Sequence, residues 1–444
     1  MKKTSAILQL RKISTIFNRI NPIQEVSNLK PFSTSSHTSL FSLKLIPIPP
    51  AFVFSAISMS QYGFSTTGEE VVKNFSSQVK GRTFLVTGPS EGGIGAQTAI
   101  SLAHASPSNI LLLGRSLPKI QPTIDAIHKI DPSITTKFVS VSLDSLSSVR
   151  EAAKIILADE TIPKIDVTIN NAAIMACPYG LTQDGFELQF GTNYVSHFLL
   201  TNLLMPKILA AAPGAVIVNV SSTGHLFADI NYESLDFNKG KDYTPFAAYA
   251  QAKTANILFS VELKEKLASK GVKSWALHPG SISSGLQKYM NQESLAEAMK
   301  IWWATGRETP ERKTLEQGCS TTLRAALDPE LKEENGSIYL SDCQIVTDPE
   351  WVKEYALDKA SASKLWNISE ELHLPLVKPA RSLIFVVSLA KIYELAANTL
   401  KTPTKSPPSA GVLRTPPTTR EGASEFYGER FTQTEEPHLL SFGK

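Results

Sequence analysis

A tyrosine and a lysine stand four residues apart in the segment YAQAK, as Tyr249 and Lys253. Positions four apart share one face of a helix, so the ammonium would lie beside the phenol. An ordinary tyrosine, with a pKa of about 10, is a poor base at neutral pH, but a neighbouring cation favours the phenolate. Such a pair has the chemistry of a general acid and base. A second pair, Tyr355 and Lys359 in YALDK, is interpreted as surface packing.

A second candidate site is the glycine-rich stretch TGPSEGGIG at residues 87–95, which follows the apolar run 83–86. If a strand ends at Gly88 and a helix begins at Gly95, the first N–H groups of the helix lack internal partners and attract phosphate oxygens. Glycines there keep side chains away from a pyrophosphate and let helix and strand approach closely. Structural turns also use glycines, but this position between strand and helix favours a dinucleotide site.

Short apolar runs without polar alternation are separated by helical patterns through the middle of the chain, which is typical of parallel strands buried on both faces. The expected strands are 83–87, 109–114, 137–143, 165–170, 215–220 and 272–278, and the longest helix is expected at about 246–269. We therefore predict the α/β class, with a doubly wound parallel sheet (Rossmann fold) in a single catalytic domain with extended termini. Tyr249 and Lys253 then follow the strand 215–220.

With these elements in place, the chain resembles the short-chain dehydrogenase/reductase family over roughly residues 80–379. The resemblance rests on the two ends of the glycine-rich loop, NNAA at 170–173, FGTNYVSHFLLT, VNVSS, YAQAK and HPG at 278–280. The later stretches KTLEQGCSTTLRAAL and NGSIYLSDCQ are similar to the retinol-dehydrogenase-like branch, particularly its fungal members.

The chain departs from the family pattern at three points. The glycine-rich loop has one extra residue, which we interpret as a bulge between Pro89 and Gly92 that the spare glycine accommodates. Ala173 replaces the last glycine of the family's N-N-A-G, and Ser142 stands where the family usually has aspartate, with Asp144 two residues later.

The resemblance implies four catalytic residues. Tyr249 would donate a proton in reduction and accept one in oxidation, while Lys253 would lower the pKa of Tyr249 and hold the nicotinamide ribose. Ser222 would hydrogen-bond the substrate carbonyl oxygen, and Asn193 would order a water relay. Ser221 is expected to turn away, because side chains alternate along a strand.

The implied cofactor is NADP (NADPH). An NAD site usually has an acidic residue about 20 residues beyond the glycines. Here the strand ends LLLGRS without a carboxylate and with Arg115, which suits the extra phosphate of NADP, although a solvated loop arginine is the alternative. The predicted cofactor-binding residues are Gly88, Ser90, Gly93, Ile94, Gly95, Arg115, Asn171, Tyr249, Lys253, Pro279, Gly280 and Ser284.

These features predict an oxidoreductase acting on CH–OH groups, which transfers a hydride between NADP(H) and a small lipophilic ketone, aldehyde or alcohol. The family's substrate lid would fall at about 283–316, whose apolar residues either contact substrate or pack on the domain: Leu286, Tyr289, Met290, Trp302 and Trp303. The alternative is a non-catalytic NADP-sensing protein on the same fold. The full set of four catalytic residues argues against it.

The ends of the chain differ from the predicted domain at 80–379. Residues 1–58 are basic and rich in serine, as in a mitochondrial transit peptide; the alternative is a non-native extension, with a cytoplasmic enzyme starting at Met59. Residues 59–79 form a lead-in. Residues 380–400 are expected to form an apolar helix, packed on the domain or in peripheral contact with a membrane, and 401–444 a disordered tail rich in Pro, Thr and Ser.

The expected partner is a small-molecule carbonyl or alcohol substrate, with a homodimer left open, and composition gives no sign of nucleic-acid binding. A net charge of +3 with 19% charged residues is an ordinary balance that does not suggest nucleic acid. Three cysteines and eight scattered histidines show no metal-ligand spacing, so we expect no metal. The apolar stretch 43–57 contains three prolines and is too short for a comfortable transmembrane span.

Overall fold

The structure is a computed structural model of the 444-residue chain, and it describes residues 62–290 and 292–373. The predictions for residues 1–58, 380–400 and 401–444 therefore lie outside the described residues. Part of the lead-in is described and contains helix α2 (Gly68–Asn74).

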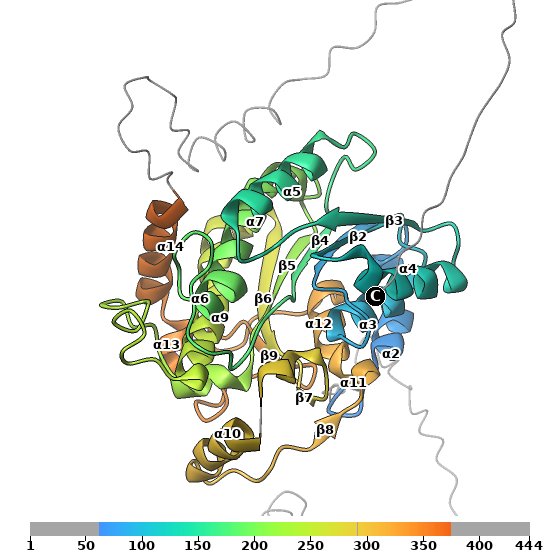
Figure 1. Ribbon diagram of the computed structural model, residues 1–444. Coiled ribbons are helices and arrows are strands. Elements are labelled where there is room, and N and C mark those ends of the chain that lie inside the picture. The colour runs from blue at the N-terminus through green and yellow to red at the C-terminus, as the bar shows by residue number, and fades with distance from the viewer. Residues whose placement is uncertain (1–61, 291, 374–444) are drawn as a thin grey trace, which may run out of the picture. The chain divides into compact units, whose positions relative to one another are not determined.

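Eight strands form one sheet in the order β10-β9-β6-β5-β4-β1-β2-β3, and every neighbouring pair is parallel except β9 and β10 (Figure 1). The strands are β1 (Thr83–Thr87), β2 (Asn109–Gly114), β3 (Thr135–Ser140), β4 (Val167–Asn170), β5 (Ala215–Val220), β6 (Val272–His278), β9 (Tyr339–Ser341) and β10 (Gln344–Ile345). Four predicted strands match β1, β2, β5 and β6 residue for residue. The predicted strands 137–143 and 165–170 overlap β3 and β4 with shifted bounds.

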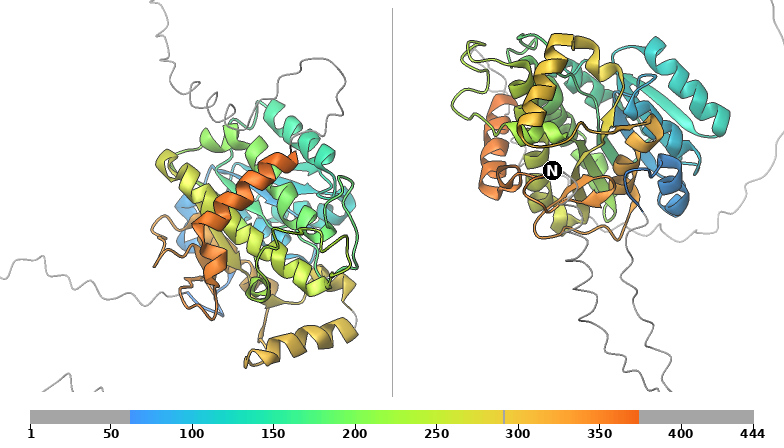
Figure 2. Two further views of the ribbon diagram at one scale, coloured as in Figure 1. Left: turned by 90° about the vertical axis from the view of Figure 1, so that its left-hand side faces the viewer. Right: turned by 90° about the horizontal axis from the view of Figure 1, so that it is seen from below.

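Helices cover both faces of the sheet, which confirms the doubly wound α/β fold (Figures 1 and 2). One layer contains α2, α3 (Ile94–Ala103), α4 (Leu117–Ile130), α11 (Leu315–Gly318) and α12 (Ser320–Leu327). The other contains α5 (Leu146–Ala158), α7 (Ser196–Leu203) and α9 (Pro245–Leu267), and α14 (Lys359–His373) packs against α9. All side chains of β1 and β5 are buried, as expected for strands covered on both faces.

The remaining elements have at most five residues each, apart from the 13-residue helix α10. They are η1 (Ser76–Gln78), α6 (Leu188–Phe190), η2 (Gly191–Val195), α8 (Met205–Leu209), η3 (Thr223–Phe227), η4 (Ala268–Lys270), β7 (Ser281–Ile282), η5 (Gly285–Tyr289), α10 (Gln292–Ala304), β8 (Arg312–Lys313) and α13 (Glu354–Leu357). Strands β7 and β8 pair in a separate two-stranded sheet. No helix within the described residues is long and apolar enough to cross a membrane.

Helix α9 is enclosed along most of its length, since 17 of its 23 residues are buried. It packs against β5 and β6 on one side and α14 on another. A helix enclosed in this way holds its side chains in fixed positions. The chain order also reverses between β1 and β4, and the crevice at such a point is where open α/β sheets bind their ligands.

Candidate active site

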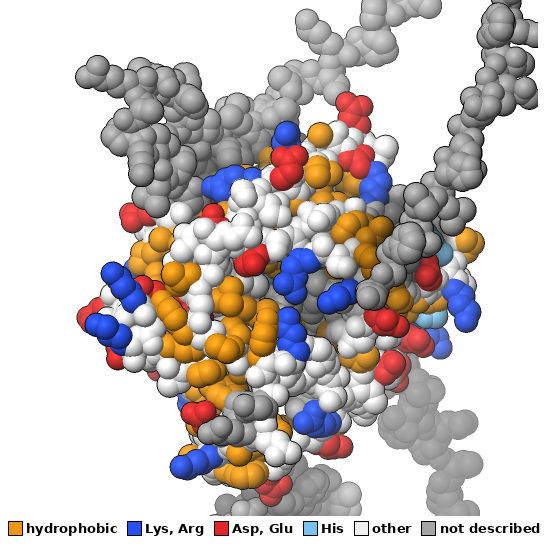
Figure 3. Space-filling view, viewed as in Figure 1, with side chains coloured by type: hydrophobic (Ala, Val, Ile, Leu, Met, Phe, Trp, Pro, Cys, Tyr) orange, Lys and Arg blue, Asp and Glu red, His pale blue; other side chains and the backbone are white. Residues whose placement is uncertain are grey.

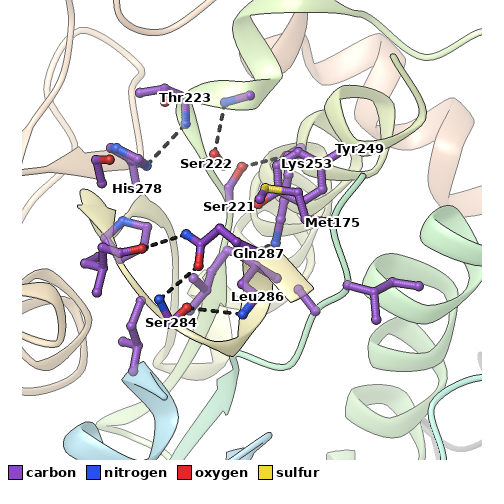
Figure 4. Close-up of a pocket in the computed structure, with 18 of the residues that line it drawn as sticks. Met175, Ser221, Ser222, Thr223, Tyr249, Lys253, His278, Ser284, Leu286 and Gln287 are labelled. Atoms are coloured by element: carbon purple, nitrogen blue, oxygen red, sulfur yellow. Dashed lines mark hydrogen bonds between the residues drawn. The ribbon is translucent and has the colours of Figure 1, made fainter. Parts of the chain in front are cut away.

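A cavity of about 1230 Å3 lies at the carboxyl ends of the parallel strands. Its wall includes Gly88 after β1, Asn171 after β4, Ser222 after β5 and Pro279 after β6. The predicted site residues that line it are Gly88, Ser90, Gly93, Ile94, Arg115, Asn171, Ser222, Tyr249, Lys253, Pro279, Gly280 and Ser284. Figure 4 shows part of this wall, with Ser222, Tyr249 and Lys253 together. The structure thus brings together most of the residues chosen from sequence.

The extra residue of the glycine-rich loop is accommodated in a turn from Ser90 to Gly93. The Gly93 N–H donates to the Ser90 carbonyl oxygen at 3.1 Å, and Gly92 has a φ of +70°, which favours glycine. The predicted bulge with a spare glycine is therefore present. The turn is tied to α4 by a second backbone bond, from the Glu91 N–H to the Lys119 carbonyl oxygen at 3.0 Å.

The start of α3 fits a pyrophosphate. Its N-cap residue, Gly93, offers no side-chain hydrogen bond, so the N–H groups of the first turn are available to an anion. Gly95 does not line the cavity but lies beneath the loop. A Cβ there would stand 2.5 Å from Asn171 Nδ2 and 2.8 Å from the Gly88 carbonyl oxygen. Asn171 Nδ2 also donates to the Thr87 carbonyl oxygen at 2.8 Å.

Gly95→Ala should therefore impair the site more than Gly92→Ala. The alanine at position 95 must displace Asn171 or the loop backbone, whereas a Cβ at position 92 meets nothing within 4 Å and costs only the roughly 1–2 kcal/mol of left-handed strain. We expect a large loss of nicotinamide-cofactor affinity for Gly95→Ala and a modest fall in Tm for Gly92→Ala. Nucleotide titration and thermal melts measure both. The reverse order would contradict this account of the loop.

At the far end of the cavity, Arg115 follows β2 and lies beside the start of α4. Lys119, in the first turn of α4, also lines the cavity and was not among the residues predicted from sequence. Asp144 also lines the cavity and accepts a hydrogen bond from the Ser142 hydroxyl. Asp144, rather than Ser142, thus lines this end of the cavity.

Ser222 and Tyr249 place two hydroxyl groups at one point of the cavity wall. Ser222 caps the short helix η3, its Oγ accepts the Gly224 N–H at 3.0 Å, and it lines the cavity together with Tyr249. Ser221 instead donates its hydroxyl to the Lys253 carbonyl oxygen at 2.7 Å. That bond agrees with the expectation that Ser221 turns away from substrate.

Burial dominates the electrostatics of Tyr249 and Lys253. Burial raises the pKa of Tyr249 to about 12 and lowers the pKa of Lys253 to about 7. The Lys253 ammonium lies 5.5 Å from the centre of the Tyr249 ring and donates to the Val220 carbonyl oxygen at 2.8 Å. The net shift of the Tyr249 pKa is upward because burial is its largest cause, so the expected lowering by Lys253 is not seen in this geometry. Tyr249 is protonated at neutral pH.

Asn193 lies behind the cavity wall and not among the residues that line it. It is fully buried in the π-helical turn η2, where its side-chain amide accepts the Ile174 N–H at 2.8 Å and donates to the Ile174 carbonyl oxygen at 2.9 Å. The Asn193 side chain therefore holds the loop after β4, and its role in a water relay stays a prediction. Its own carbonyl accepts a hydrogen bond from His197 Nδ1 at 3.1 Å.

Comparison with known proteins agrees with this geometry. The family model for the short chain dehydrogenase matches residues 82–295. Mouse retinol dehydrogenase 12 is 35% identical over 295 residues, covering 66% of this chain and 87% of that protein. Short-chain dehydrogenase/reductase prx1 of Penicillium roqueforti is 36% identical over 301 residues, covering 66% and 84%.

The chain belongs to the short-chain dehydrogenase family. Its relatives place it in the retinol-dehydrogenase-like branch. Members of the family are oxidoreductases that act on alcohols or carbonyls with a nicotinamide cofactor. Among solved structures, an uncharacterized protein from Mycobacterium paratuberculosis is 31% identical, with a TM-score of 0.49 and coverage of 66% of this chain and 93% of that one.

Two residues of this short-chain dehydrogenase were not selected from sequence. His278, the histidine of HPG, lines the cavity, and its Nδ1 accepts the Thr223 N–H at 3.3 Å. Burial lowers the pKa of His278 to about 3, so the ring is neutral. Lys313 has a buried side chain that covers Gly280, where a Cβ would lie 2.6 Å from Lys313 Cδ, and it pairs with Asp342 at 2.5 Å. No local spacing in the sequence indicates that the side chains of His278 and Lys313 lie at the cavity.

The substrate side of the cavity has an apolar wall. Leu286, Tyr289, Met290 and Trp302 of the predicted lid line it, whereas Trp303 does not and is 54% exposed. The predicted lid segment 283–316 therefore forms part of the cavity wall, and its residues Leu295, Met299 and Ile301 line the cavity as well. Phe227 and Trp351, from outside this segment, complete the apolar wall. Figure 3 shows hydrophobic side chains gathered on this face, in the region of α9 and α10. Within the described residues, no group of three or more His, Cys, Asp or Glu could hold a metal ion.

Proposed function

We propose that the protein is an NADP-dependent oxidoreductase that interconverts a lipophilic carbonyl compound and its alcohol. The main observation behind this proposal is that the groups for cofactor binding and for proton transfer line one cavity. Two hydroxyl groups, on Ser222 and Tyr249, a buried amine on Lys253 and an uncapped helix start at Gly93 all line it. This combination provides an anion-binding cradle beside a proton donor.

The residues present fit a nicotinamide dinucleotide. The start of α3 would hold the pyrophosphate, Lys253 the nicotinamide ribose, and Arg115 with Lys119 the 2′-phosphate. When bound, the cofactor supplies or accepts the hydride. The remaining chemistry is a proton transfer, and this chain supplies it.

In reduction, the Ser222 and Tyr249 hydroxyls donate hydrogen bonds to the substrate oxygen, where negative charge develops. Tyr249 then gives up its proton to that oxygen. Because burial raises the pKa of Tyr249 to about 12, the donor form predominates at neutral pH, whereas oxidation needs the phenolate. The site is therefore better prepared for reduction at neutral pH, and oxidation should become faster as the pH rises.

The substrate proposed is lipophilic, because the wall around Leu286, Met290 and Trp302 is apolar. Burying apolar surface contributes roughly 25 cal/mol per Å2, so extended hydrocarbon groups should raise kcat/KM. A screen of ketones, aldehydes and alcohols of increasing chain length with purified full-length protein, following NADPH absorbance, tests the proposal. Tight NADPH binding without turnover of any compound would instead favour the NADP-sensing protein.

Cofactor choice gives a separate prediction. Arg115→Ala should weaken NADPH binding by roughly tenfold or more, as expected for loss of a charge-assisted contact, and leave NADH affinity little changed. Lys129→Ala is the matched control, because Lys129 is an exposed cation on α4 that does not line the cavity. Fluorescence titration of both nucleotides measures the effect. An equal loss for NADPH and NADH would assign Arg115 a structural role.

A further inference from the structure

The turn that presents Ser222 is packed directly against the catalytic tyrosine. Gly224 donates its N–H to Ser222 Oγ at 3.0 Å. A Cβ on Gly224 would lie 3.0 Å from Tyr249 Cε1 and 3.4 Å from Ser222 Oγ. The position of this turn therefore sets the position of the serine hydroxyl relative to the phenol.

The buried side chain of His225 stabilises the turn that contains Ser222 and Gly224. Its ring is fully buried, and Nδ1 lies 2.7 Å from the Ser222 carbonyl oxygen. A carbonyl oxygen only accepts hydrogen bonds, so Nδ1 must carry the proton. Burial lowers the pKa of His225 to about 4, and the ring is neutral. His225 thus ties its own backbone to that of Ser222.

The backbone of His225 is held in turn by a distant residue. The Tyr355 hydroxyl, on α13, donates to the His225 carbonyl oxygen at 2.7 Å across 130 residues of chain. Tyr355 is half-buried and packs against the hydrophobic core. Tyr355 is therefore more than a surface-packing residue, and the interpretation made from its sequence pattern is corrected by this hydrogen bond. Lys359, its partner in the pattern, forms a separate ion pair with Glu265 at 3.0 Å.

We infer that Tyr355 is a positioning residue for the catalytic serine. Its hydroxyl fixes the His225 carbonyl, and the His225 ring fixes the Ser222 carbonyl, so α13 determines where the Ser222 hydroxyl meets substrate. The inference rests on the proposed function in one respect: Ser222 must contact the substrate oxygen. Displacements of about 1 Å in reacting groups can lower rates by up to about 100-fold, so one remote hydrogen bond has a measurable effect.

Tyr355→Phe tests the inference, because it removes only the hydroxyl. Tyr232→Phe is a matched control: Tyr232 is also half-buried, and its hydroxyl donates to the Ser361 carbonyl oxygen at 2.8 Å. The Tyr232 bond also joins the domain to a C-terminal helix, because Ser361 lies on α14. Tyr232 itself lies after η3, so its bond does not hold the turn that contains Ser222. We expect similar small falls in Tm for both variants. Only Tyr355→Phe should lower kcat, by about tenfold, with NADPH affinity unchanged. Equal kcat values in the two variants would overturn the inference.

A double-mutant cycle with Ser222→Ala asks whether Tyr355 acts through the serine. We expect Tyr355→Phe to cause no further loss of kcat in the Ser222→Ala background. Multiplicative losses would show that Tyr355 acts elsewhere, and would overturn the inference while leaving the proposed function intact. If Ser222→Ala alone kept the wild-type rate, both the role of Ser222 and the inference would fail.

Discussion

Tyr249→Phe should lower the turnover number by roughly 10²- to 10⁴-fold, the usual contribution of a positioned general acid. NADPH affinity should stay near the wild-type value, because the ring and Lys253 remain. The Tyr249 phenol lines the cavity together with Ser222, where the substrate oxygen is proposed to bind. Single-turnover kinetics and nucleotide titration separate the two quantities. A rate close to wild type would refute the proposed proton donor.

The control for this variant is Tyr194→Phe. Tyr194 is also buried, and its hydroxyl pairs with the Ser369 hydroxyl at 2.7 Å rather than with a residue of the cavity wall. Both substitutions remove the hydroxyl of a buried tyrosine, and each should cost at most about 1 kcal/mol of stability. Only the change at position 249 should abolish turnover. Comparable kinetics in the two variants would mean that lost stability explains the effect.

Lys253→Met should weaken NADPH binding and lower the turnover number, yet raise the stability of the free protein. Burial lowers the pKa of Lys253 to about 7 from an ordinary value of 10.5, so the folded state carries this charge at a cost. Methionine removes the charge with a chain of similar length. The Val220 carbonyl oxygen keeps a second partner, Asn256 Nδ2, at 3.2 Å. A loss of activity with a gain in Tm is unusual for a purely structural residue.

The pH dependence of that gain has a definite sign. Between about pH 7 and 10.5 the unfolded chain binds the Lys253 proton and the folded chain has lost it, so this group makes wild-type stability rise with pH. Below that window the full cost is present. The stability advantage of Lys253→Met should therefore be largest at or below pH 7 and disappear toward pH 10.5. Denaturant titrations at several pH values measure it, and a constant difference would contradict the depressed pKa.

The sequence predicted the sheet well because its central strands are uniformly apolar. Strands such as β1 and β5 are buried at every position, so their sequence pattern also marks their ends. Strands β9 and β10 were not predicted, since three and two residues carry too little pattern. Local spacing likewise identified Tyr249 and Lys253, which are neighbours on one helix.

Properties that depend on distant contacts were not predictable. The rise in the Tyr249 pKa comes from burial of α9, which no local motif reports. The Asn193 amide is paired with Ile174, 19 residues earlier, and Tyr355 with His225, 130 residues earlier. Each bond joins segments that only the tertiary fold brings together.

The extended glycine loop has a consequence for redesign of cofactor preference. Two hydrogen bonds fasten it to α4: the Glu91 N–H to the Lys119 carbonyl oxygen, and the Thr123 hydroxyl to the Pro89 carbonyl oxygen, each at 3.0 Å. The glycine-rich loop and the start of α4, which follows Arg115, are therefore held in a fixed relative position. Replacing the second strand and its following turn with those of a relative that has the shorter loop would shift α4 relative to the loop, and would so disturb both bonds. A successful exchange of specificity has to move the loop and the first turns of α4 as a single cassette.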